Sequence, residues 1–177
     1  MLVGRNGKYA NDDALENVIR YVTRTRPIDD GNDLFSSGVC GADYTGGIDT
    51  VITQFQITED LYNIDTRGGR RVFHEVFSLA PFELQTVSSD IIYNALFIAG
   101  RKASLDYFNQ GFQVVYAVHI SNHPHIHFAI NAINFKTGLK WRARKADIWQ
   151  REKNLNAYLY EYVNQMNPIK SIAEFVG

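Results

Sequence analysis

The sequence HISNHPHIHFAIN, from His119 to Asn131, contains four of the five histidines of a 177-residue chain. Side chains of a β-strand alternate between its two faces, so a strand that begins at His125 places His125, His127 and Asn131 on one face. Ile126, Phe128 and Ile130 share the opposite face. We expect the apolar face to pack on the core and the histidines to point toward an open side of the sheet.

A hairpin connects this strand to the preceding one, and its turn decides whether a third histidine joins the pair. A three-residue turn, Asn122-His123-Pro124, places His119 opposite His127, and directly opposed Cβ atoms lie about 5 Å apart. A two-residue turn would mix the polar and apolar faces, so the three-residue turn is favoured. Three convergent neutral imidazoles predict a divalent-metal site with coordination positions left open. Polar residues on an exposed sheet face are the alternative explanation.

The surrounding sequence predicts helices and strands on both sides of the hairpin. Asp13 and Glu16 have the spacing of a capping box at the start of an amphipathic helix that ends near Arg24. Hydrophobic spacing and composition predict further helices at residues 45–63, 88–108 and 146–166, and strands at residues 71–80, 112–121 and 125–135. These elements make an α+β fold, an α/β sandwich on a central antiparallel sheet that carries the histidine hairpin. The helices are expected to pack around the sheet on one of its faces.

Size and composition predict one soluble domain over residues 1–177. Hydrophobic residues make up 45% of the chain and charged residues 21%, which is ordinary for a globular protein. The sequence has no apolar run of about 20 residues, and its first residues lack the apolar stretch of a signal peptide. Cys40 is the single cysteine, so the chain cannot form an internal disulfide. We therefore expect a cytoplasmic protein with no membrane partner.

The charges are unevenly distributed along the chain. Residues 1–66 contain five Lys or Arg and eleven Asp or Glu, whereas residues 67–177 contain thirteen and eight. The basic residues are densest at Lys136, Lys140, Arg142, Arg144, Lys145, Arg151 and Lys153. Such a patch can neutralise nucleic-acid phosphates, although a solvated helix face would also explain it.

The histidine stretch resembles the third motif of relaxases, the HUH-type endonucleases of plasmid and conjugative-transposon mobilisation proteins. In that motif one histidine precedes a histidine–hydrophobe–histidine pair by a short hairpin, and the likeness continues through residues 134–138 (NFKTG). Upstream, residues 73–78 (FHEVFS) resemble the family's histidine-bearing strand, and residues 18–22 (VIRYV) resemble its first motif, which carries a nucleophilic tyrosine. Together these matches span roughly residues 10–155.

The resemblance implies a site- and strand-specific DNA endonuclease that nicks single-stranded DNA at an origin of transfer. Tyr21 would be the nucleophile and would form a 5′-phosphotyrosine adduct. His74 would activate Tyr21 or contact the phosphate, although a purely structural hydrogen bond is an equally good reading. Accessory mobilisation proteins and a coupling protein are expected as further partners.

The resemblance also implies a metal, Mg²⁺ or Mn²⁺, held by His119, His125 and His127. The family usually has one more residue between its first two metal histidines, so His123 remains an alternative third ligand. Asn131 and His123 are expected to support the ligands from the second shell. The residues expected to contact DNA are Lys136, Lys140, Arg142, Arg144 and Lys145.

The position of Tyr21 on its helix supports this role, because it lies on the polar flank about 120° from the apolar stripe. Three other readings remain open. A rolling-circle replication initiator would use Tyr158, Tyr160 or Tyr162, but these lack an interleaved lysine. A cupin-type enzyme would need a glutamate within residues 128–134, which contain none. A non-catalytic DNA-binding relaxase homologue would keep the basic patch without the chemistry.

Overall fold

The computed structural model describes residues 2–6, 9–63, 69–79, 87–121, 123–142 and 144–166. Its elements in chain order are β1 Leu2–Asn6, α1 Ala14–Thr23, β2 Leu34–Cys40, α2 Gly47–Leu61, β3 Val72–Ser78, α4 Ser89–Asn109, β4 Val114–His119, β5 His125–Asn131 and α5 Lys145–Met166. All four predicted helices and all three predicted strands are present within a few residues of their expected bounds. The strands β1 and β2 were not expected from the sequence. No helix in the described ranges is both long and apolar enough to cross a membrane.

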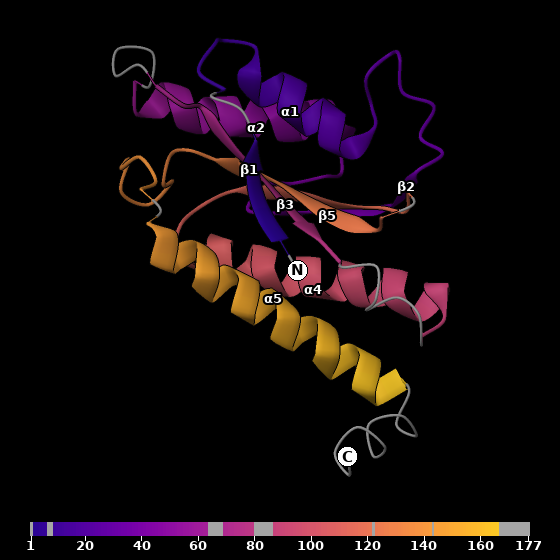
Figure 1. Ribbon diagram of the computed structural model, residues 1–177. Coiled ribbons are helices and arrows are strands. Elements are labelled where there is room, and N and C mark those ends of the chain that lie inside the picture. The colour runs from indigo at the N-terminus through magenta and orange to yellow at the C-terminus, as the bar shows by residue number, and fades with distance from the viewer. Residues whose placement is uncertain are drawn as a thin grey trace.

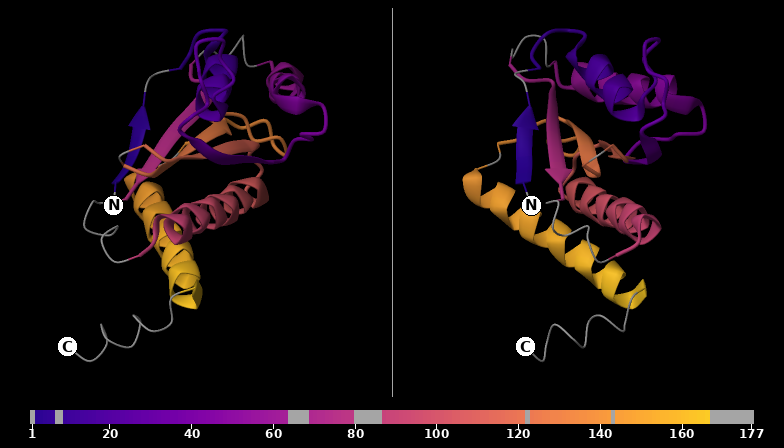
Figure 2. Two further views of the ribbon diagram at one scale, coloured as in Figure 1. Left: turned by 90° about the vertical axis from the view of Figure 1, so that its right-hand side faces the viewer. Right: turned by 45° about the vertical axis from the view of Figure 1, so that its right-hand side comes forward.

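The five strands form one antiparallel sheet in the order β1-β3-β5-β4-β2. Helices α1 and α2 cover one face of this sheet, and α4 and α5 cover the other (Figures 1 and 2). The α+β class and the central antiparallel sheet with its histidine hairpin are therefore confirmed. The expectation that the helices pack on one face is wrong, because both faces carry apolar side chains that need cover.

Two separate cores hold the layers together. The first lies between the sheet and helices α4 and α5 and includes Phe77, Tyr116 and Phe128. The second lies between the sheet and helices α1 and α2 and includes Ile19 and Phe55. The alternation of side chains along each central strand supplies both cores, since neighbouring residues of a strand point to opposite faces.

The register of the hairpin differs from the expected one by two residues. His119 pairs with His125, not with His127, so the connection between the two strands is longer than the expected three residues. The Ile120 amide donates to the Asp33 carbonyl at 2.8 Å, on the side of β4 away from β5. A shift of two residues keeps every side chain on its face, so the three histidines still share one face of the sheet.

The sequence had suggested that the histidine face of the sheet is open, but in the structure this face is covered. It is the face that α1 and α2 cover, and His119 and His127 are only 0% and 3% exposed. His125 lies nearer the rim and is half-buried. The histidines therefore lie at the border between the second core and solvent, where the C-terminal end of α1 meets the sheet.

Helix α1 begins and ends differently from expectation. Asp13 makes no side-chain cap, and Glu16 accepts a hydrogen bond from Arg20 Nε at 2.7 Å, so the predicted capping box is absent. At the other end, Arg24 has φ 54° and ψ 40°, the left-handed conformation in which helices commonly end. This conformation usually belongs to glycine, so the presence of arginine points to a role for its side chain.

Candidate active site

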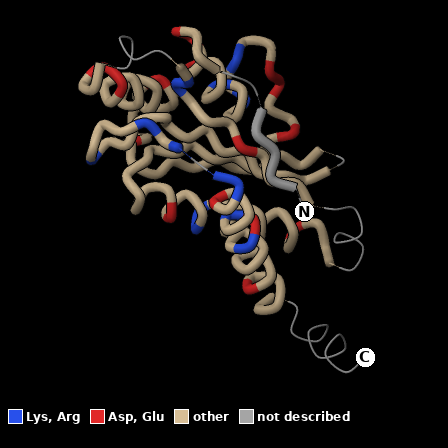
Figure 3. Tube along the Cα trace, turned by 60° about the vertical axis from the view of Figure 1, so that its left-hand side comes forward, with Lys and Arg blue, Asp and Glu red and all other residues tan. Residues whose placement is uncertain are grey.

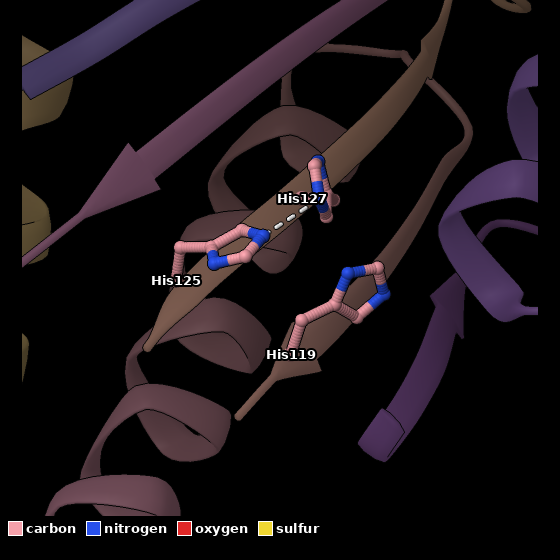
Figure 4. Close-up of side chains that lie close together, drawn as sticks. All are labelled: His119, His125 and His127. Carbon is pink, nitrogen blue, oxygen red and sulfur yellow. Dashed lines mark hydrogen bonds between the residues drawn. The ribbon is translucent and has the colours of Figure 1, made fainter. Parts of the chain in front are cut away.

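Three histidines from the adjacent strands β4 and β5 converge at one end of the sheet. His119, His125 and His127 each offer a ring nitrogen, and these nitrogens all lie within 4.8 Å of one another. The rings face each other in Figure 4, where one nitrogen of His119 is turned toward the other two histidines. The Nε2 atoms of His125 and His127 are 2.9 Å apart.

The second nitrogen of each ring is fixed by another group of the protein. His119 Nε2 lies 2.8 Å from the carbonyl of Val22, and His125 Nδ1 lies 2.7 Å from the carbonyl of His123. His127 Nδ1 lies 2.8 Å from His74 Nε2. A ring that donates to a carbonyl keeps a lone pair on its other nitrogen, so His119 and His125 direct lone pairs into the cluster. His127 also does so when its Nδ1 donates to His74.

This arrangement fits a divalent cation. Two nitrogens that each lie about 2.1 Å from one ion at a right angle are about 3.0 Å apart. The observed separation of 2.9 Å between the Nε2 atoms of His125 and His127 agrees with that value. Three imidazoles leave further positions on the ion for water or a phosphate oxygen.

Burial keeps the imidazoles of His74, His119 and His127 neutral, and metal ligation requires a neutral imidazole. Burial lowers the pKa of His119 to about 4, and burial together with the neighbouring histidines lowers the pKa of His74 to about 4. Burial is also the main cause of the lowered pKa of His127, to which His119 and His125 add. The buried rings are therefore neutral at neutral pH, with one ring proton each.

Arg24 contacts the cluster from the end of α1. Its guanidinium forms two hydrogen bonds of 2.7 Å with Asp33, and its Nη2 lies 3.0 Å from His119 Nδ1. A guanidinium can only donate, so Nδ1 of His119 accepts and Nε2 donates to Val22. A cation bound at this Nδ1 and the Arg24 guanidinium would therefore use the same lone pair.

Tyr21 lies against the histidines, in the last turn of α1. Its ring centroid is 5.4 Å from that of His127 and 5.7 Å from that of His74. The guanidinium groups of Arg24 and Arg26 each lie 4.8 Å from the centroid of the phenol ring. The sequence prediction that Tyr21 is off the apolar stripe agrees with its half-buried position. Two positive charges thus flank a phenol beside the histidine cluster.

His74 lies on β3, next to β5, and both of its ring nitrogens are engaged. Nε2 contacts His127 Nδ1 at 2.8 Å, and Nδ1 contacts the Tyr9 hydroxyl at 3.1 Å. The ring is 3% exposed. With both nitrogens hydrogen bonded to other side chains, His74 has none directed at Tyr21. Its contacts are those of a residue that orients His127.

The two residues expected to support the ligands have different positions. The Asn131 amide donates to the Phe55 carbonyl and to Gln113, and its oxygen accepts from the Ile133 amide. Asn131 therefore holds the far end of β5 to its neighbours, and the expectation that it supports the metal ligands is wrong. The side chain of His123 is exposed and outside the cluster, but its backbone carbonyl contacts His125.

The basic segment lies at the other end of the sheet. Strand β5 runs from His125 to Asn131, so residues that follow it begin about 20 Å from the first histidine. Figure 3 shows the positive charges along the loop between β5 and α5. The structure does not bring Lys136, Lys140, Arg142, Arg144 or Lys145 to the cluster.

Three residues near the cluster were given no role from the sequence: Arg24, Arg26 and Asp33. The single local signal was the spacing of Arg24, three residues after Tyr21 on the same helix. The others come from loops, and the fold alone brings them to the histidines.

The antiparallel sheet thus presents three histidines, which could hold a metal ion, to a tyrosine on a covering helix. Residues 21–163 match the family model described as relaxase, MobA/VirD2-like, nuclease domain. The chain belongs to this relaxase family.

Solved structures show the same fold. The MobM relaxase domain (MOBV; Mob_Pre), bound to plasmid pMV158 oriT DNA in a manganese-bound crystal structure at pH 6.8, superposes with a TM-score of 0.56. The two sequences are 10% identical, and the match covers 92% of this chain and 87% of the MobM chain. No curated protein sequence matches this chain significantly.

Proposed function

We propose that this relaxase nicks one strand of DNA at an origin of transfer, with Tyr21 as the nucleophile. The proposal rests on the position of Tyr21, whose ring lies 5.4 Å from that of His127 and between the histidine cluster and two arginines. Membership of the relaxase nuclease family supports the reaction class. The oriT DNA and manganese in the MobM structure support DNA and a divalent cation as ligands.

The reaction is a transesterification at one phosphate. The phenolic oxygen of Tyr21 attacks phosphorus, and the phosphorus bond to the 3′ oxygen breaks. The phenol releases its proton to water and the 3′ oxygen takes one up, so the 5′ end remains attached as a phosphotyrosine. Because the bond energy is retained in this ester, the reverse reaction can rejoin the strand.

His119, His125 and His127 would hold the metal, Mg²⁺ or Mn²⁺. When bound, this cation would withdraw negative charge from the phosphate and orient it for attack. Arg24 and Arg26 supply further positive charge on the Tyr21 side of the site. His74 holds His127 in place through the contact of 2.8 Å between their rings.

The basic segment between β5 and α5 would bind DNA away from the cleaved phosphate. Arg144 is 85% exposed in its side chain, and Lys136, Arg142 and Lys145 are also exposed. A single strand that crosses the molecule would contact the proposed group Lys136, Lys140, Arg142, Arg144 and Lys145 after leaving the histidine end. Accessory mobilisation and coupling proteins would act on the complex of this protein with DNA.

The replication-initiator alternative has weaker support. Tyr158 lies on α5, on the opposite face of the sheet from the histidines, and its hydroxyl contacts Asp106 at 2.8 Å. The hydroxyl is thus part of a contact between α4 and α5. Tyr160 and Tyr162 belong to the same helix.

A covalent-adduct experiment tests the proposal. The protein is incubated with Mn²⁺ and end-labelled single-stranded oriT DNA and analysed under denaturing conditions. Wild type should form an adduct, Tyr21→Phe should form none, and a control, Tyr44→Phe, should behave as wild type because Tyr44 is 53% exposed in a loop before α2. Binding without an adduct in wild type would favour the non-catalytic homologue. An adduct that maps to Tyr158, Tyr160 or Tyr162 would favour the initiator.

A further inference from the structure

We propose that Tyr9 is a positioning residue of the nuclease site, which acts through His74 to set the tautomer of His127. This inference rests on the proposed metal site. Three side chains from separate parts of the sequence form a continuous row of hydrogen bonds. Tyr9 Oη lies 3.1 Å from His74 Nδ1, and His74 Nε2 lies 2.8 Å from His127 Nδ1. The row reaches the cluster at His127 Nε2, which lies 2.9 Å from His125 Nε2.

The row can carry its protons in two directions. In one, Tyr9 donates to His74 and His74 donates to His127, so the proton of the neutral His127 ring is on Nε2, and this nitrogen cannot bind a cation. In the other, His127 donates to His74 and His74 donates to the oxygen of Tyr9, so Nε2 of His127 keeps its lone pair. Only the second direction makes His127 a ligand, and it requires an acceptor beyond His74.

The Tyr9 oxygen is that acceptor. Ligating histidines commonly donate their distal N–H to a carboxylate, a carbonyl or water, which fixes the ring and raises its basicity. Here His127 donates to a second imidazole, which is itself neutral and can accept on Nε2 only if its proton is on Nδ1. Without the phenol oxygen, a buried Nδ1–H of His74 would lose its partner, and a buried unpaired donor is costly.

The backbone holds Tyr9 in this position. Its carbonyl accepts a hydrogen bond of 2.9 Å from the amide of Arg71, which precedes β3. Its φ is 36°, in the left-handed region that a bulky residue rarely adopts. Its ring packs 5.9 Å from that of His74. Residues kept in such a conformation are typical of functional sites, where surrounding contacts outweigh the cost.

Metal affinity tests the inference independently of catalysis. We expect Tyr9→Phe to bind Mn²⁺ about 10- to 100-fold more weakly than wild type in a calorimetric titration, as found when outer-shell partners are removed. The matched control is Tyr62→Phe, which loses a tyrosine hydrogen bond to the Phe135 carbonyl beyond the far end of β5. The control should bind Mn²⁺ like wild type. Equal affinities of Tyr9→Phe and wild type would overturn the inference and leave the proposed function intact.

A second measurement needs no variant. Histidine ¹⁵N NMR spectra of the Zn²⁺-loaded wild-type protein should show Nδ1 protonated in both His74 and His127. An unprotonated Nδ1 in His74 would overturn the inference even if Tyr9→Phe failed to fold. Failure of wild type to bind either Mn²⁺ or Zn²⁺ would instead contradict the proposed metal site, and the inference with it. An adduct at Tyr9 in the DNA experiment would show that this residue is a nucleophile and not a positioning residue.

Discussion

Each histidine of the cluster depends on a second contact that selects its tautomer. These contacts come from the carbonyls of Val22 and His123 and from the ring of His74. Burial keeps His119 and His127 neutral, and rings aimed by such contacts are ready to bind a metal. The three side chains are therefore expected to bind as a unit.

Metal content of single variants tests the ligand set. His125→Ala and His127→Ala should each lose bound Mn²⁺, because two imidazoles hold a divalent cation much less tightly than three. His123→Ala is the matched control, since its side chain is exposed and its carbonyl, which contacts His125, is retained. Equilibrium dialysis followed by elemental analysis measures the content. Loss in His123→Ala with retention in His119→Ala would identify His123 as the third ligand.

At the scale of elements, the C-terminal end of α1 carries two side chains that contact the histidine cluster, Tyr21 and Arg24. Tyr21 lies in the last turn, and Arg24 ends the helix in the left-handed conformation. Its guanidinium then reaches Asp33, just before β2, and His119, at the end of β4. The backbone conformation at Arg24 therefore aims its charge at the histidine end of the sheet.

The Arg24→Gly variant keeps the left-handed backbone conformation that ends α1 but removes the positive charge of the side chain. Glycine adopts this conformation without strain, which stabilises the fold by about 1 kcal/mol. The variant also loses the partly exposed ion pair between Arg24 and Asp33, whose contribution to stability is of similar size, so the two effects offset each other. We therefore expect little change in Tm, but adduct formation slower by on the order of a hundredfold, as when one donor to a developing charge is removed. Asn63→Gly is the control, because Asn63 has φ 51° outside the cluster. An unchanged rate in Arg24→Gly would exclude a catalytic contribution of this side chain.

Substitutions in the loop between β5 and α5 test whether the basic segment binds DNA. Replacing both Arg142 and Arg144 with alanine should weaken binding of single-stranded DNA and lower its salt slope by roughly 0.7 per charge removed. Because this loop lies at the far end of β5, the rate of adduct formation at saturating DNA should stay near that of wild type. Filter binding across a range of salt concentrations gives the slope. An unaltered slope would mean that these residues form only a solvated surface.

At the scale of the whole molecule, buried histidines make the fold sensitive to acid. The pKa of His74 and of His119 is lowered to about 4 by burial, from 6.5 for an unburied histidine. Between these values the unfolded chain binds protons that the folded protein does not, so the free energy of unfolding falls as the pH falls below about 6.5. Each histidine contributes up to about 1.4 kcal/mol per pH unit in that range.

Urea unfolding at pH 7, 6 and 5 in the presence of a chelator measures this loss. Above pH 7 the stability contributed by these neutral rings should be fully present. His74→Gln, which cannot take up a proton, should lose less stability than wild type between pH 7 and pH 5. Equal losses in both proteins would show that His74 does not titrate differently in the folded and unfolded states.

The strands that the sequence did not predict lie at the two edges of the sheet. Strand β2, LFSSGVC, has no alternating pattern and contains residues with low strand propensity. Its Gly38 lies directly against the Tyr116 ring, where a Cβ atom would collide. Pairing with β4 and packing against a neighbouring aromatic ring determine that this segment forms a strand. Neither interaction can be predicted from the local sequence of the segment.

The sequence by itself determined that the three histidines share a face and that Tyr21 lies off the apolar stripe of its helix. Both follow from the strand and helix periods, which relate residues close together in the chain. A register error of two residues left the histidine face unchanged for the same reason. The tertiary structure alone decided that Tyr9 reaches His74, that Arg24 reaches His119, and that the basic loop lies away from the cluster. Such contacts depend on how helices and strands distant in sequence pack together, because the burial of apolar surface fixes that arrangement and local periodicity does not encode it.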